Sequence, residues 1–121
     1  MTFKHIADLE NMPIADLASQ YKHAAEGTSN SAPRQANKSH DVMHIYYKQL
    51  RQTEAGRSAI TRLLNDDSPE VRCWAAAHSL AWATDEAKMT LIALRDAKGP
   101  RSFTAEMTLS EFEKGRLSFE Y

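Results

Sequence analysis

Apolar residues recur at helical spacing along most of the chain. Between Pro13 and Glu26, for example, Ile14, Leu17, Ala18 and Tyr21 follow the i, i+3, i+4, i+7 rule of an amphipathic helix. No segment alternates β-branched and polar residues over the length of a strand, and valine, which is common in strands, occurs only twice. The pattern therefore predicts an all-α fold.

The same pattern predicts about six helices in all. After the first helix we expect helices over residues 33 to about 53, 57–65, 69–82, 84 to about 98 and 102–114. The clearest start is Ser68-Pro69-Glu70, because Ser68 suits an N-cap and Pro69 suits the first helical turn. Thr84 and Ser102 are the predicted caps of the last two helices.

Two further sets of residues refine this prediction. The chain's glycines fall where the helical pattern ends or starts: Gly27, Gly56, Gly99 and Gly115. The second helix is expected to bury a wide apolar stripe, formed by Val42, Ile45, Tyr46 and Leu50 and widened by Met43 and Tyr47.

Length and composition limit the organisation of the chain. With 121 residues, two separate cores would each be too small, so we expect a single helical domain over residues 1–121. Within it, residues 1–12 form a lead-in and residues 116–121 a tail that folds back through Leu117, Phe119 and Tyr121. Hydrophobic residues at 42% and charged residues at 26% exclude disorder of the whole chain.

Charge and targeting features narrow the class of protein. The net charge of -1 includes no basic excess, which argues against direct nucleic-acid binding. Asp8 and Glu10 interrupt any signal-peptide core, and no apolar run approaches the roughly 20 residues of a membrane span. The lone Cys73 cannot form an internal disulfide, so we expect a soluble cytoplasmic protein that does not bind membranes.

One segment resembles a known repeat. Residues 63–80 run from Leu63-Leu64 through Asp66, Pro69 and Val71-Arg72 to small residues and Leu80, and this order resembles a HEAT repeat. A weaker copy follows, in which Leu94, Asp96 and Pro100 echo Leu64, Asp66 and Pro69. Since one such unit cannot bury its own apolar face, stacked helix pairs are expected.

Two segments of the chain also resemble a protein family. Residues 71–78 and 105–117 are similar to a small bacterial family of unknown function with a HEAT-like helical fold. The resemblance implies a HEAT/armadillo-like, right-handed stack of about six helices, and the family supplies no catalytic residues. Some HEAT-like relatives resemble immunity proteins, which neutralise toxins delivered by competing bacteria.

His40 and His44 form the sharpest candidate for metal chemistry. Their i, i+4 spacing places both on one helix face, as in zinc sites. A zinc protease would carry Glu where this chain has Asp41, and no third ligand is evident. We favour two partly exposed histidines that flank a buried Val42, with a small metal-dependent enzyme as an alternative.

Three neighbouring residues have structural interpretations that we prefer. His78 lies on an apolar helix face without an obvious nucleophile, so we expect it to be packed rather than catalytic. Cys73 is expected to be a small core residue. The resemblance to HEAT repeats implies that Arg72 hydrogen-bonds acidic residues of adjacent turns, for which Asp66 and Asp67 are the nearby candidates.

Acidic and aromatic residues supply the candidate binding surface. Two acidic clusters, Asp66, Asp67 and Glu70 and then Asp85 and Glu86, suit helix capping and also suit contact with a basic partner such as a nuclease toxin. Trp82, at a helix end, is expected to be partly exposed, whereas Trp74 is expected in the core. Tyr46 and Tyr47 suit either role.

These observations predict a non-enzymatic protein-binding module without a cofactor. The specific hypothesis is an immunity protein, monomeric or weakly dimeric, that binds a cognate toxin domain; a general adaptor and a metal-dependent enzyme using His40 and His44 are the alternatives. The candidate partner-binding residues are Asp66, Asp67, Glu70, His78, Trp82, Asp85 and Glu86.

Overall fold

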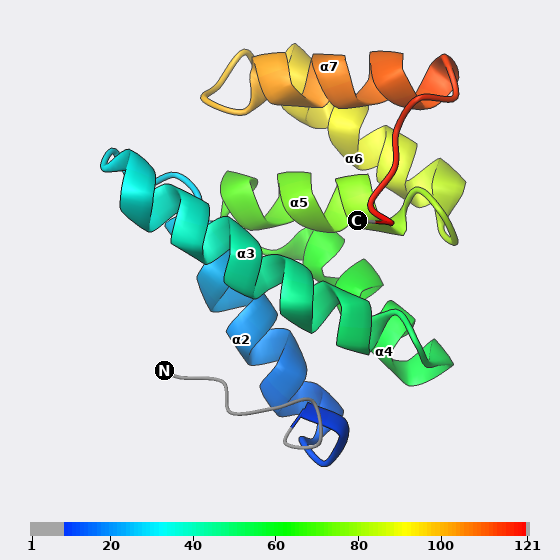
Figure 1. Cartoon of the computed structure of the whole chain (residues 1–121). Coiled ribbons are helices and arrows are strands. Elements are labelled where there is room, and N and C mark those ends of the chain that lie inside the picture. The colour runs from blue at the N-terminus through cyan, green and yellow to red at the C-terminus, as the bar shows by residue number, and fades with distance from the viewer. Residues whose placement is uncertain (1–8, 121) are drawn as a thin grey trace. The chain divides into compact units, whose positions relative to one another are not determined.

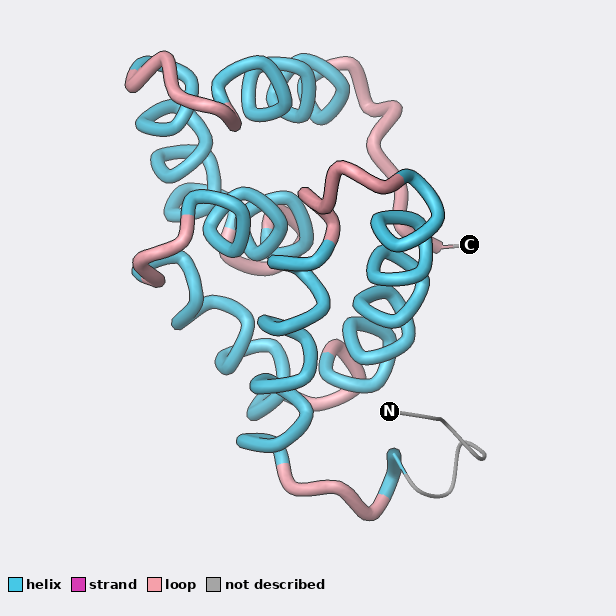
Figure 2. Tube along the Cα trace, turned by 90° about the vertical axis from the view of Figure 1, so that its left-hand side faces the viewer, coloured by secondary structure: helices cyan, strands magenta, loops and turns pink. Residues whose placement is uncertain are grey.

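A computed structural model of the chain describes residues 9–120 and contains no strand among them (Figures 1 and 2). Six α-helices lie within residues 14–113, which confirms the all-α prediction. Their bounds are α2 (Ile14–Gly27), α3 (Pro33–Leu50), α4 (Glu54–Arg62), α5 (Pro69–Ser79), α6 (Thr84–Asp96) and α7 (Ser102–Glu113), with a 3₁₀ turn, η1 (Leu63–Asn65), before α5. The first eight residues of the predicted lead-in, and Tyr121 of the tail, lie outside the described residues.

The chain packs as two compact units, Met1–Ile60 and Thr61–Tyr121. The division falls inside α4, which contributes its last two residues to the second unit. The expectation of one domain over the whole chain stays a prediction.

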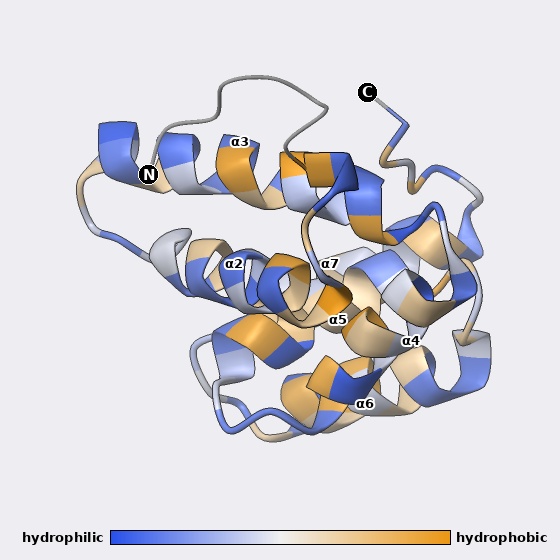
Figure 3. Ribbon diagram, turned by 90° about the horizontal axis from the view of Figure 1, so that it is seen from below, coloured by the Kyte–Doolittle hydropathy of each residue, from blue (hydrophilic) through white to orange (hydrophobic). Residues whose placement is uncertain are grey.

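In the first unit α2 and α3 pack against each other (Figure 1). Both helices carry one hydrophobic and one hydrophilic side (Figure 3). The buried residues of α3 include a stripe at i, i+3, i+4 and i+7, which consists of Met43, Tyr46, Tyr47 and Leu50. The expected burial of Val42 and Ile45 is wrong, because Val42 is half-buried and Ile45 is 38% exposed. Val42 and Ile45 lie beside the buried stripe on the helix surface. The stripe with the larger side chains is the one that is buried.

The prediction that Gly56 separates two helices is wrong. It lies in the first turn of α4, and its N–H donates to Oγ1 of Thr53 at 3.0 Å. A Cβ at this position would overlap the carbonyl oxygen of Leu50, the residue that ends α3. The absence of a side chain therefore allows α4 to begin three residues earlier than expected, directly against the end of α3.

In the second unit α6 packs against both α5 and α7 (Figure 1). Ser68 caps α5 as predicted, since its Oγ accepts a hydrogen bond from the N–H of Val71 at 3.3 Å. Thr84 and Ser102 are not caps. Their hydroxyls donate to earlier backbone carbonyls, of Leu80 and Arg95 respectively, both at 2.8 Å. Each hydroxyl therefore ties its helix to the end of the preceding one.

The end of the chain folds back on α5, as its apolar residues predict. Gly115, two residues after the last residue of α7, takes a left-handed φ of 71°, which turns the chain. The tail then runs to the C-terminal end of α5 (Figure 1), where the ring of Phe119 meets the ring of His78 edge-on at 4.7 Å.

Candidate functional site

The two predicted acidic clusters lie at opposite ends of one helix. Asp66 and Asp67 precede α5, whereas Asp85 and Glu86 stand in the first turn of α6, beyond the other end of α5. A helix of 11 residues is roughly 16 Å long at 1.5 Å per residue. Asp67, Asp85 and Glu86 are exposed, but the structure does not gather them into one acidic surface.

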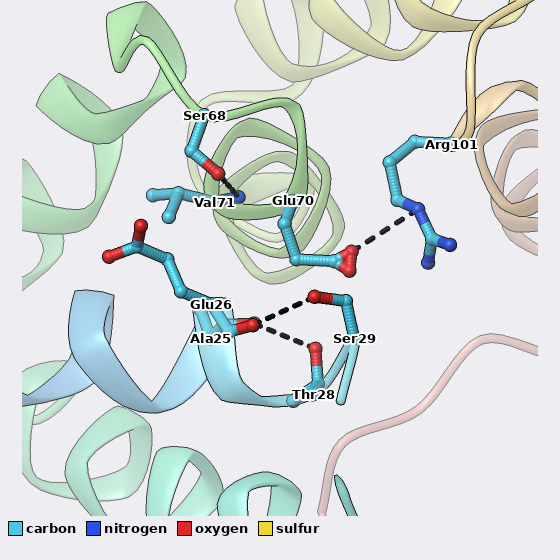
Figure 4. A network of polar contacts seen from close by, with 8 residues as sticks. All are labelled: Ala25, Glu26, Thr28, Ser29, Ser68, Glu70, Val71 and Arg101. Carbon is cyan, nitrogen blue, oxygen red and sulfur yellow. Dashed lines mark hydrogen bonds and ion pairs between the residues drawn. The ribbon is translucent and has the colours of Figure 1, made fainter. Parts of the chain in front are cut away.

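Glu70 is not a surface carboxylate. Its side chain is 10% exposed, and its Oε2 lies 3.2 Å from Nε of Arg101 (Figure 4). The other oxygen, Oε1, is buried and accepts no hydrogen bond from the described residues. Burial raises the pKa of Glu70, and the positive charge of Arg101 partly opposes this. Glu70 thus belongs to the internal structure of its unit, which corrects its assignment to a partner-facing cluster.

His78 is also internal, being 1% exposed. Its ring lies 5.6 Å from that of Trp74 and 4.7 Å from that of Phe119. It is packed, as we expected, and is therefore inaccessible as a partner-binding residue. Trp74 itself is half-buried rather than fully in the core.

Trp82 is half-buried, as predicted. Its indole Nε1 donates a hydrogen bond to Oγ1 of Thr61 at 2.9 Å, so its polar edge already has an intramolecular partner.

His40 and His44 stack in parallel, with ring centroids 6.4 Å apart and an angle of 4° between the ring planes. His40 is partly exposed, as predicted. His44, which lies beside Tyr47, is buried and Val42 is only half-buried, so the prediction is wrong for these two residues. Within residues 9–120 no group of three His, Cys, Asp or Glu side chains could hold a metal ion.

Cys73 and Arg72 have structural surroundings. Cys73 is 4% exposed, and burial raises the pKa of its thiol to about 11. Arg72 hydrogen-bonds both predicted residues through their backbone, since its Nη1 donates to the carbonyls of Asp66 (2.7 Å) and Asp67 (3.1 Å). The carboxylate of Asp66 instead accepts the N–H of Ser68 at 3.0 Å.

The outer face of α7 carries exposed apolar side chains that the sequence analysis did not single out. Phe103 is 72% exposed and Met107, one turn later, is 45% exposed. The buried residues of α7, Ala105 and Leu109, have the same spacing but are offset by two positions, so they lie on the opposite side of the helix. Two apolar stripes on one helix are a sequence signal for an exposed apolar face. When such a helix packs on a single side, its second stripe stays exposed.

A broad hollow adjoins the outer face of α7. It has a volume of about 720 Å³ and lies where α6 ends and α7 begins. Its lining includes both charged and apolar side chains, among them Arg95, Lys98, Pro100, Phe103 and Glu106.

Comparison with known proteins shows a similarity in fold and none in sequence family. The crystal structure of the protein RPA1889 from Rhodopseudomonas palustris CGA009 matches with a TM-score of 0.83 and 24% sequence identity, over 92% of this chain and 97% of the other. No protein-family model matches the chain, and no curated protein has significant sequence similarity to it. In addition, none of the helices in the described part is both long and apolar enough to cross a membrane.

Proposed function

We propose that this chain is a non-enzymatic protein-binding module and that its partner docks on the outer face of α7. The observation that carries the proposal is the exposure of Phe103 and Met107, one turn apart on the side of α7 away from its buried residues. Fully burying such side chains yields roughly 1.5–3 kcal/mol each, and aromatic anchors of this kind dominate protein interfaces.

The surroundings of this face suit a protein ligand. Glu106 is exposed beside Met107, and Arg95 and Lys98 line the adjoining hollow. An apolar centre with charged groups of both signs at its edge is the common arrangement of a protein interface. We include in the proposal a cytoplasmic location and a monomer or weak dimer in the absence of the partner.

The finer proposal is that the partner is a toxin domain that this chain neutralises. Support comes from the resemblance of residues 63–80 to a HEAT repeat, together with the immunity proteins that some HEAT-like relatives resemble. Exposed carboxylates at two places in the second unit, Asp67 before α5 and Asp85 and Glu86 on α6, would speed association with a basic toxin.

The test compares tagged wild-type protein with two variants after expression in the native host, followed by mass spectrometry of the bound material. Phe103→Ser should abolish recovery of a stoichiometric partner. Ile45→Ser, which changes an exposed apolar residue of α3, should leave recovery unchanged. Equal recovery with both variants would contradict docking on α7.

A second step addresses the toxin. The recovered partner is expressed alone, with wild-type protein and with Phe103→Ser. Growth arrest that only the wild type relieves supports immunity, whereas a partner without any effect on growth supports an adaptor.

A further inference from the structure

A second, smaller hollow lies within the unit Thr61–Tyr121. It has a volume of about 350 Å³ and is lined by Leu64, Arg72, Thr90, Ala93, Leu94 and Ala97. Four of these residues are aliphatic, and Arg72 is the one charged residue among the six. The hollow thus combines an apolar lining from η1, α6 and Ala97, which follows α6, with a single cation from α5.

Arg72 is held in place with donors to spare. Its two hydrogen bonds to the carbonyls of Asp66 and Asp67 both start from Nη1. A guanidinium has five N–H donors, and those on Nε and Nη2 are not used by the described residues. None of the ion pairs found among residues 9–120 includes Arg72, and Oδ2 of Asp66 accepts the N–H of Ser68.

We infer that this hollow binds a carboxylate, namely the C-terminal residue of a partner protein with an aliphatic side chain. The Nε and Nη2 edge of a guanidinium matches the two oxygens of a carboxylate. A C-terminal residue carries its carboxylate and its side chain on one Cα, so a single residue supplies both the charged and the apolar group. The inference rests on the proposed function only in assigning the carboxylate to a protein partner.

The size and the remaining polar group of the hollow agree with this ligand. A volume of about 350 Å³ is at the lower end of ligand sites, which suits one residue and its side chain better than a folded loop. The hydroxyl of Thr90 donates to the carbonyl of Glu86 at 3.0 Å, which leaves its oxygen able to accept the N–H of an incoming peptide.

The test is an NMR titration of the full chain with N-acetyl-leucine, and with its neutral amide as the control ligand. N-acetyl-leucine should shift the Arg72 Nε–H resonance and the backbone amide resonances of Thr90, Ala93 and Ala97. These shifts should reach a plateau as the ligand concentration rises. The amide should bind at least about tenfold more weakly, as expected for loss of charged hydrogen bonds. Equal shifts with the amide, or with inorganic phosphate, would overturn the inference, because a neutral group or any anion would then suffice.

Two variants locate the site. Ala93→Glu places a negative charge in the lining at an exposed helix position, so the fold should persist and the affinity for N-acetyl-leucine should fall at least about tenfold. The matched control, Ala55→Glu at an exposed position of α4, should bind as the wild type does. Unchanged binding by Ala93→Glu contradicts the site.

The variant Phe103→Ser separates this inference from the proposed docking face. Phe103 does not line the smaller hollow. The NMR shifts that N-acetyl-leucine causes in Phe103→Ser should therefore equal those in the wild type. Failure of partner recovery and failure of carboxylate binding are therefore observed independently.

Discussion

Nε of Arg101 lies 3.2 Å from Oε2 of Glu70, which joins the residue before α7 to the first turn of α5. The Glu70 side chain is 10% exposed and that of Arg101 is 32% exposed. This pair links two helices of the second unit that are separated in sequence by α6, so its removal should affect both stability and its dependence on pH.

Replacing Arg101 with Ala should lower the free energy of unfolding by about 1–3 kcal/mol, because a buried carboxylate would lose its charged partner. The control is Arg95→Ala, since Arg95 forms an ion pair with its exposed neighbour Asp96 at the surface. That variant should show a clearly smaller loss. Urea denaturation at neutral pH measures both, and equal losses would contradict a specific role for the pair.

The ionisation of Glu70 should weaken folding as the pH rises. Burial raises the pKa of Glu70 above its ordinary value of 4.5, so the folded state holds this proton at pH values where the unfolded chain has released it. The contribution of Glu70 to stability therefore falls between pH 4.5 and the raised pKa. Relative to the wild type, Glu70→Gln should gain stability as the pH rises from about 4 to about 7.

Glu111 provides the control of opposite sign. The hydrogen bond from Arg116 lowers the pKa of Glu111, so its stabilising effect is present above pH 4.5 and is lost as the pH falls through the lowered pKa. Glu111→Gln should therefore lose stability relative to the wild type as the pH rises. The Glu111 effect lies below pH 4.5 and the Glu70 effect above it, so denaturation curves from about pH 2.5 to about pH 7 test both slopes. Parallel slopes would contradict the assignment.

Gly56→Ala should destabilise the first unit by about 1–3 kcal/mol, because the new Cβ would overlap the backbone carbonyl of Leu50. Gly99→Ala is the matched control, since a Cβ there would meet nothing within 4 Å. Its expected effect is a stabilisation of up to about 1 kcal/mol, from the reduced entropy of the unfolded chain. Thermal unfolding distinguishes the two, and similar melting temperatures would show that the contact is easily relieved.

Lys98→Gly should stabilise the protein by about 0.5 kcal/mol, because Lys98 adopts a left-handed φ of 55° that costs an L-residue more than it costs glycine. Lys114→Gly tests the reverse case. Lys114 has a φ of −85°, so glycine there should only add unfolded-state entropy and lower stability. Melting temperatures that move in the same direction for both variants would refute the backbone explanation.

Cys73 should react with a disulfide reagent such as DTNB at pH 8 only as fast as the protein opens. The thiol is buried and its pKa is raised to about 11, so both access and thiolate are lacking in the folded state. Adding urea should accelerate the reaction in step with unfolding. Rapid reaction of the folded protein would contradict the burial of this side chain.

Part of the candidate site was within reach of the sequence. Asp67, Asp85 and Glu86 are exposed as their polarity predicts, and Trp82 is partly exposed at its helix end. Glu70 could not be placed in the same way. A carboxylate in a first helical turn is normally solvated, and its burial depends on Arg101, which lies 31 positions later in the sequence.

The six helices and several of their ends could be predicted from the amino-acid sequence. These depend on local physics: the spacing of apolar residues, the side-chain cap of Ser68 and the left-handed turn at Gly115. Such interactions involve residues a few positions apart, so they can be read directly along the chain.

Which apolar stripe of a helix is buried depends on tertiary packing and could not be predicted from the sequence. In α3 the stripe of Met43 and Tyr46 is buried and Ile45 is exposed; in α7 Ala105 and Leu109 are buried and Phe103 is exposed. Both stripes of each helix are apolar, and periodicity cannot choose between them. The choice depends on which face meets a neighbouring helix, and it leaves Phe103 and Met107 at the surface where we propose that a partner binds.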